Sequence, residues 1–149
     1  MIGEMFSYVM PGASRSAAGD SYDRAMAQAM LAKEAHLFHK AERYYRAAIS
    51  LKPRQSLPHT QLGWVYTQEK KLAQAKREEE TAIKLNNGDA DAYYNLAGIL
   101  FMEHKYALAA VEYRKSLAID PDRHCKCGPL YSLLKKYPNA TPSSDTSNK

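Results

Sequence analysis

The chain has 149 residues, enough for about one domain, and it carries 22 alanines against 8 valines and isoleucines together. Because alanine favours helices and β-branched residues favour strands, this composition argues against a large sheet. The formal net charge is +5 with both signs mixed along the chain, which weakly favours acidic partners and by itself says little about nucleic acid. We do not expect nucleic acid as a partner. The longest apolar run, Leu96–Met102, is far shorter than the roughly 20 residues that span a bilayer, so we expect no membrane span.

The two ends of the chain differ in composition from the rest. Residues 1–20 lack the basic and apolar regions of a secretory leader, and we expect a flexible N-terminal segment there. Residues 138–149 are rich in serine, threonine, asparagine and proline and are expected to form a disordered tail. The two cysteines are separated by one residue and cannot connect distant parts of a fold, so a reducing, cytoplasmic setting is the expectation.

Between these ends the sequence repeats itself every 34 residues. Two sets of residues share this interval, and they are Pro53, Asn87 and Pro121 and the small residues Ala41, Ala75 and Ala109. A period of this length, with helical spacing inside it, is typical of a helical solenoid.

Each repeat is predicted to form two helices. In the third repeat the first helix begins after the N-cap Asp89, and its packing face carries Tyr93, Leu96, Ala97 and Leu100. The second helix ends before Pro121, because proline disfavours helix in the residue before it.

These repeats resemble tetratricopeptide repeats. The family pattern places a leucine, a small residue and an aromatic on the first helix, then an alanine, an aromatic and a closing proline on the second. Residues 90–123 match it best, residues 56–89 match with Glu79 in place of the second aromatic, and residues 22–55 match through their second helix. The resemblance implies an all-α solenoid of three helical hairpins within residues 21–137. A short amphipathic run at 129–137 is expected to form a C-terminal capping helix.

In tetratricopeptide solenoids the first helices line a concave groove, so the resemblance implies that their outward residues face a bound segment. Here these positions carry aromatic and methionine side chains, which supply large contact areas or adapt in shape. We therefore predict a non-catalytic interaction module, a scaffold or adaptor, that binds a protein or peptide segment with apolar anchors. The predicted groove residues are Met26, Met30, Gln61, Trp64, Gln68, Tyr94, Asn95, Phe101 and Met102. Among them, Trp64, Tyr94 and Phe101 are expected to form one apolar strip.

Some members of this family hold a C-terminal carboxylate with lysine, arginine and asparagine side chains. The matching positions here are Met26, Met30, Gln61, Asp91 and Asn95, which include no cation, so we do not expect such a clamp. Three alternatives stay open. The chain could be a small chaperone for an apolar secreted or membrane-associated client, or a nucleic-acid adaptor that uses basic second helices. The N-terminal residues or the C-terminal helix could also cover the groove.

Motifs for catalysis and metal binding are weak in this sequence. It has no glycine-rich phosphate loop, no His-Glu-x-x-His and no nucleophile elbow. His36 and His39 are interpreted as residues of a solvent-exposed turn. The segment from His124 to Cys127 offers three soft ligands without a second ligand pair elsewhere, so it is interpreted as a loop. We expect no enzyme activity, no small-molecule substrate, no cofactor and no metal.

Overall fold

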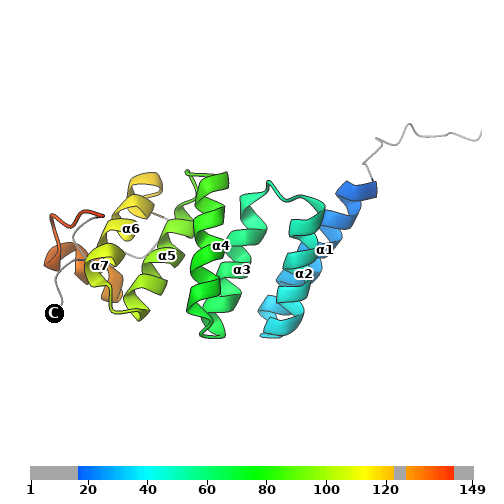
Figure 1. Cartoon of the computed structure of the whole chain (residues 1–149), viewed down its shortest axis with the longest axis horizontal. Helices are drawn as coiled ribbons and strands as arrows, with labels where there is room; N and C mark the ends of the chain where they lie inside the picture. The colour runs from blue at the N-terminus through cyan, green and yellow to red at the C-terminus, as the bar shows by residue number, and fades with distance from the viewer. Residues whose placement is uncertain (1–16, 123–126, 143–149) are drawn as a thin grey trace, which may run out of the picture.

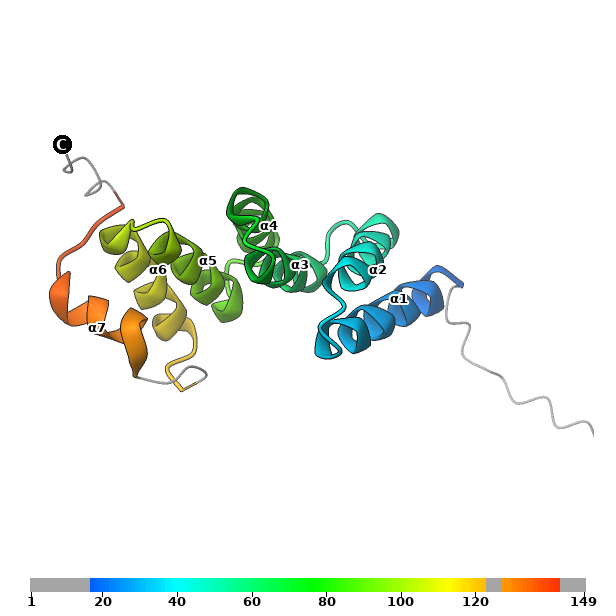
Figure 2. The same cartoon turned by 90° about the horizontal axis from the view of Figure 1, so that it is seen from below.

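The chain folds into helices alone over the residues that this computed structural model describes, 17–122 and 127–142 (Figure 1). They are α1 (Ala17–Glu34), α2 (Phe38–Leu51), α3 (Ser56–Gln68), α4 (Leu72–Leu85), α5 (Ala90–Met102), α6 (Tyr106–Ile119) and α7 (Gly128–Lys136). The first six pack pairwise as α1–α2, α3–α4 and α5–α6, and these pairs follow one another along the long axis in Figure 2. The predicted all-α solenoid of three helical hairpins is confirmed.

The three hairpins close through the same backbone turn. His36, Lys70 and His104 all adopt left-handed backbone conformations, with φ of 55°, 60° and 63°. In each turn the next N–H donates to a carbonyl five residues earlier, as from Lys71 to Tyr66 at 2.9 Å. This bond satisfies a carbonyl that the end of the first helix would otherwise leave unpaired. His36 is exposed, in agreement with its interpretation as a turn residue.

Alanine makes the closest contacts between the paired helices. The side chains of Ala41, Ala75 and Ala109 on the second helices are 0% exposed, and Ala97 on α5 is also 0% exposed. Because the distance between packed helices depends on the side chains at the contact, small residues let the two backbones approach.

The packing face predicted for the first helices is largely confirmed, but it is too narrow. Leu96, Ala97 and Leu100 are buried as expected, and Tyr93 is half-buried. Val65 and Ile99, which were not assigned to it, are both 0% exposed and belong to one core cluster. Helices α3 and α5 each contact the preceding repeat as well as the second helix of their own repeat. More of their circumference is therefore buried.

Glu79 lies buried where the other two hairpins bury a tyrosine. The side chains of Tyr45, Glu79 and Tyr113 occupy matching places on α2, α4 and α6, and all are at most 1% exposed. Glu79 rests against Gly63 of α3, where an added Cβ would overlap its carboxyl group. Glycine at position 63 therefore makes room for the carboxyl group.

The Glu79 carboxyl is only partly satisfied by hydrogen bonds. Asn95 Nδ2 of α5 donates to Glu79 Oε1 at 3.0 Å, whereas Oε2 has no partner among the described residues. Burial raises the pKa of Glu79 well above its usual value, the bond from Asn95 lowers it, and the nearby carboxylates of Asp89, Asp91 and Glu78 raise it further. The carboxyl therefore keeps its proton to a higher pH than an exposed glutamate does.

Described structure reaches into both predicted end segments. Helix α1 begins at Ala17, inside the segment 1–20 for which flexibility was predicted. At the other end, the Arg114 guanidinium of α6 donates to the carbonyls of Tyr137, Pro138 and Ala140 at 3.0–3.4 Å. The beginning of the predicted disordered tail is thus fixed to α6. Residues 1–16 and 143–149 lie outside the described part.

The C-terminal cap packs against the last hairpin. Helix α7 contacts both α5 and α6, and its Leu133 is buried with Leu96 and Leu100 in a second core cluster. Leu130 of α7 follows Leu96 by the same 34 residues that separate Leu96 from Leu62. The cap therefore takes the place that the first helix of another repeat would occupy.

The Leu96 register can be tested by truncation. Leu96→Ala should lower the free energy of unfolding by about 2–5 kcal/mol, because it removes a side chain that is 7% exposed and leaves a cavity. Leu31→Ala is the matched control, since Leu31 is 66% exposed and its loss should change stability little. Urea unfolding followed by circular dichroism measures both. Equal midpoints for the two variants would contradict the register.

Glu79 should make stability depend on pH. Its folded pKa is raised above the unfolded value, so its contribution is fully present below about pH 4.5 and is lost as pH rises toward the folded pKa. Relative to wild type, Glu79→Gln should therefore gain stability as pH rises from about 4.5 toward the raised pKa of folded Glu79, by at most about 1.4 kcal/mol per pH unit. Thermal and urea unfolding across this range measure the difference. The exposed neighbour Glu80 provides the control, because the stability of Glu80→Gln should depend on pH in the same way as that of wild type. A parallel curve for Glu79→Gln as well would show that Glu79 is ionised in the folded protein.

Candidate functional site: the first-helix face

The predicted groove residues lie on α1, α3 and α5, and we call this set of residues the first-helix face. Its members differ in exposure. Met30 and Gln68 are exposed, and six others are half-buried: Gln61, Trp64, Tyr94, Asn95, Phe101 and Met102.

Met26 does not belong to this surface, and its prediction as a groove residue is wrong. The side chain is 6% exposed and lies in the core cluster with Ala25 and Ala29 of the same helix. Alanines leave space between helices, and a flexible, unbranched methionine fills such irregular gaps well. The first-helix face on α1 is therefore represented by Met30, whose side chain is 46% exposed.

Trp64 of α3 is contacted by side chains from two other helices. Its ring makes an edge-on contact with Phe38 of α2, at 6.1 Å between centroids. The Lys33 ammonium of α1 lies 5.3 Å from the Trp64 ring centroid and also donates to Gln61 Oε1 at 2.6 Å. A half-buried aromatic ring fixed in this way is well suited to act as a contact residue, because little freedom is left to lose on binding.

The other two aromatic residues of the face contact α6. Tyr94 makes an edge-on contact with Tyr113 at 5.9 Å, and Phe101 makes one with Tyr106 at 5.3 Å. Phe101 packs against the C-terminal core cluster and Trp64 against the N-terminal one. The rings of the face therefore pack against different residues and different core clusters. One continuous apolar strip stays a prediction.

Asn95 is the polar residue at the centre of the α5 part of the face. Its amide nitrogen is engaged by Glu79, which sequence analysis had noted only as a departure from the repeat pattern. Asp91 lies one helical turn before Asn95, so the two side chains are neighbours on the same side of α5. This part of the face is therefore acidic and rich in acceptors.

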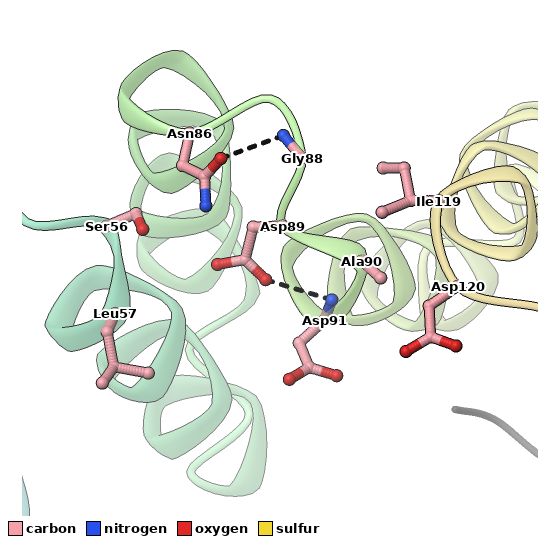
Figure 3. Close-up of a pocket in the computed structure, with 9 residues that line it drawn as sticks. All are labelled: Ser56, Leu57, Asn86, Gly88, Asp89, Ala90, Asp91, Ile119 and Asp120. Carbon is pink, nitrogen blue, oxygen red and sulfur yellow. Dashed lines mark hydrogen bonds between the residues drawn. The ribbon is translucent and has the colours of Figure 1, made fainter. Parts of the chain in front are cut away.

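A depression of about 410 Å³ adjoins Asp91 at the N-terminal ends of α3 and α5 (Figure 3). Its lining combines acidic, small polar and apolar residues: Ser56, Leu57, Asn86, Gly88, Asp89, Ala90, Asp91, Ile119 and Asp120. Asp89 caps α5, accepting from the backbone N–H groups of Asp91 and Ala92 at 3.1 and 3.2 Å, and from Thr60 Oγ1 at 2.9 Å. The depression was not predicted. The sequence pattern indicated Asp89 only as a cap and Asp91 only as an acid at a clamp position.

One group of potential metal ligands occurs among the described residues, between α2 and the turn that follows α3. His39, Glu42 and Glu69 offer ligand atoms within 4.8 Å of one another. The two carboxylates are already paired with cations, because Lys71 Nζ lies 2.8 Å from Glu69 and Arg46 lies 3.0 Å from Glu42. This arrangement is that of an ion-pair network. The predicted loop at His124–Cys127 lies outside the described residues except for Cys127.

The basic residues of the second helices are partly committed to the fold. Arg46 donates to Tyr66 Oη at 2.7 Å, and that hydroxyl donates in turn to Glu42 at 3.0 Å. Arg114 fixes the segment after α7. These two cations are therefore less suited to a phosphate-binding ridge than the exposed Arg43 and Arg77. Within the described part, no helix combines the length and apolar composition that crossing a membrane requires.

Comparison with known proteins agrees with this architecture. The sequence profile of the tetratricopeptide repeat matches residues 90–123. No curated protein matches the sequence.

Solved structures that superpose on the chain differ widely in sequence. The Arabidopsis OM64 TPR domain is 16% identical with a TM-score of 0.71, over 80% of this chain and 95% of that one. The first TPR of Spaghetti (RPAP3), bound to the HSP90 peptide SRMEEVD, is 19% identical with a TM-score of 0.71, over 81% and 93%. The O-GlcNAc transferase of Thermobaculum terrenum is 20% identical with a TM-score of 0.74, and the match covers 80% of this chain but only 23% of that one. Residues 90–123 thus match the tetratricopeptide repeat in sequence, and the chain shares the fold of tetratricopeptide repeat domains along the solenoid.

Proposed function

We propose that the chain is a non-catalytic interaction module whose first-helix face binds a segment of another protein. The observation that carries the proposal is the half-buried Trp64, whose ring is contacted by Phe38 and Lys33, together with other partly exposed residues on α1, α3 and α5. The solved RPAP3 domain, with a similar fold, is bound to a peptide. Its acidic peptide is not carried over to this chain, because the clamp positions here hold no cation.

Apolar anchors on the partner suit this face best. Met30 is exposed, and Trp64, Phe101 and Met102 are half-buried. Aromatic and methionine side chains contribute strongly to peptide contacts because they bury large apolar areas. A scaffold or adaptor role in the cytoplasm follows from this proposal as an expectation. A chaperone for an apolar client would use the same face, with a client that is insoluble when unbound.

Affinity capture with matched variants tests the proposal. Proteins captured by wild type and by Arg77→Ala, but not by Trp64→Ala, would be partners of the first-helix face. Affinity for a partner identified in this way should fall by about 1–3 kcal/mol in Trp64→Ala and in Phe101→Ala, because both remove an anchor. Arg77→Ala should change it little, since exposed charges contribute little.

Thermal unfolding of the same variants separates binding from folding. Because Trp64 and Phe101 are half-buried, each truncation should lower the melting temperature modestly and leave the protein folded at the temperature of the assay. Normal binding by Trp64→Ala and Phe101→Ala with loss in Arg77→Ala would contradict the proposal. That result would favour the basic second helices and an acidic or nucleic-acid partner.

A further inference from the structure

The connection between α4 and α5 carries a pair of residues that the connections after α2 and α6 lack. Asn87 is followed by Gly88, and this is the single asparagine–glycine step in the sequence. The positions that match Asn87 in the other repeats hold Pro53 and Pro121, and neither proline is followed by glycine. The departure from the closing proline therefore gives the second repeat a chemistry of its own.

An asparagine followed by glycine can modify itself without an enzyme. The glycine backbone nitrogen attacks Cγ of the asparagine side chain, so a new C–N bond closes a succinimide ring. The bond from Cγ to the side-chain nitrogen breaks, and that nitrogen leaves as ammonia after taking up, through water, the proton that the glycine nitrogen loses. Water then opens the ring at either carbonyl and gives aspartate or isoaspartate. Glycine favours the attack because it has no Cβ to restrict its backbone.

The turn around Asn87 is accessible to this reaction. Asn86, Asn87 and Gly88 are all exposed, so water reaches the amide and the ring that would form from it. The turn is closed by the Asp89 N–H, which donates to the Asn86 carbonyl at 3.2 Å. Within the described part of the chain, the Asn87 side chain makes no hydrogen bond that would hold its amide in place.

The Asn86 side chain engages the nitrogen that would attack. The Gly88 N–H donates to Asn86 Oδ1 at 3.1 Å, as Figure 3 shows. The nitrogen has to lose this proton and turn toward Asn87 Cγ, so the bond to Asn86 must break first. A single exposed hydrogen bond contributes little free energy, and it therefore slows the reaction without preventing it.

The same connection determines how α5 begins. Asp89 accepts from the Ala92 N–H at 3.2 Å at the start of α5 and from Thr60 Oγ1 of α3 at 2.9 Å. Isoaspartate at position 87 routes the main chain through the side chain and adds one carbon atom to it two residues before Asp89. The cap is then displaced relative to Thr60. Aspartate at the same position keeps the length of the main chain and places a negative charge near a helix N-terminus, where it is favourable.

We propose that Asn87 is a site of spontaneous deamidation, slowed by the Asn86 side chain, and that isoaspartate formed there loosens the junction between the second and third repeats. Because this junction positions α5, the change extends to the part of the first-helix face that α5 carries. The inference does not depend on the proposed function, since it rests on the chemistry and contacts of the turn.

Mass spectrometry of the full chain after incubation at neutral pH provides the test. The tryptic peptide that follows Lys84 contains both Asn87 and Asn95, and fragmentation locates the replacement of an amide by an acid and distinguishes isoaspartate from aspartate. Modification should occur at Asn87 and not at Asn95, whose amide is held by Glu79.

Variants of the turn test the role of each neighbour. Asn86→Ala should deamidate at position 87 about three- to tenfold faster than wild type, the factor that corresponds to one exposed hydrogen bond. Gln55→Ala, an exposed residue of the preceding connection, is the control and should keep the wild-type rate. Gly88→Ala should react several-fold more slowly. Alanine fits there, because Gly88 has no positive φ and an added Cβ would meet Asn86 Oδ1 at an ordinary contact distance of 3.4 Å.

Melting temperatures separate the effect of the longer main chain from that of the added charge. Incubated wild type, rich in isoaspartate, should melt at a lower temperature than fresh protein. Asn87→Asp should melt like fresh wild type, and incubated Gly88→Ala should keep its initial melting temperature.

Three results would overturn the inference. An unmodified Asn87 in both wild type and Asn86→Ala would show that the turn does not react. Equal rates in these two proteins would show that Asn86 does not slow the reaction. A melting temperature of Asn87→Asp as low as that of the incubated protein would assign the loss of stability to charge and not to the longer main chain.

Discussion

Close contact between helices through alanine is the constraint on which the rest of this structure depends. Ala41, Ala75 and Ala109 are completely excluded from solvent, one in each hairpin. Helix axes generally lie about 8–10 Å apart, and the side chains at the contact decide where in this range a pair falls. One turn after each alanine comes the larger buried side chain of the hairpin. The alanine contact therefore determines how much room that side chain has, and a bulkier residue there would separate the two helices that hold it.

Much of this fold could be predicted from the sequence, because the same pattern of packing residues recurs three times with a period of 34 residues. The period indicated the hairpins, and the spacing of Leu96, Ala97 and Leu100 indicated a buried face. Val65 and Ile99 were missed for a physical reason: a single helical face describes a helix with one neighbour, and a helix inside a solenoid has neighbours on two sides. Met26 was misplaced in a similar way, since the pattern assigns a direction to a position but does not say how much space the surrounding alanines leave.

The candidate site was less predictable than the fold, because its properties depend on pairs of residues from different helices. Position within the repeat was enough to place Trp64 and Asn95 on the first helices. The direction of the Asn95 amide depends on Glu79, 16 residues earlier, and the location of the Lys33 ammonium depends on Gln61, 28 residues later. Such contacts follow from tertiary packing rather than from local spacing. The one signal in the sequence was Glu79 itself, a carboxyl group where the repeat pattern has an aromatic ring.

The left-handed turn shared by the three hairpins also limits how this protein can change in length. His36, Lys70 and His104 hold the same backbone conformation at the same register, so the phase between the two helices of each hairpin is set by the main chain. Inserting or deleting one residue there would rotate the second helix by about 100° relative to the first, since an α-helix has about 3.6 residues per turn. The alanine of that helix would then face away from its partner. Variation in length is therefore far more damaging within a hairpin turn than at the chain ends.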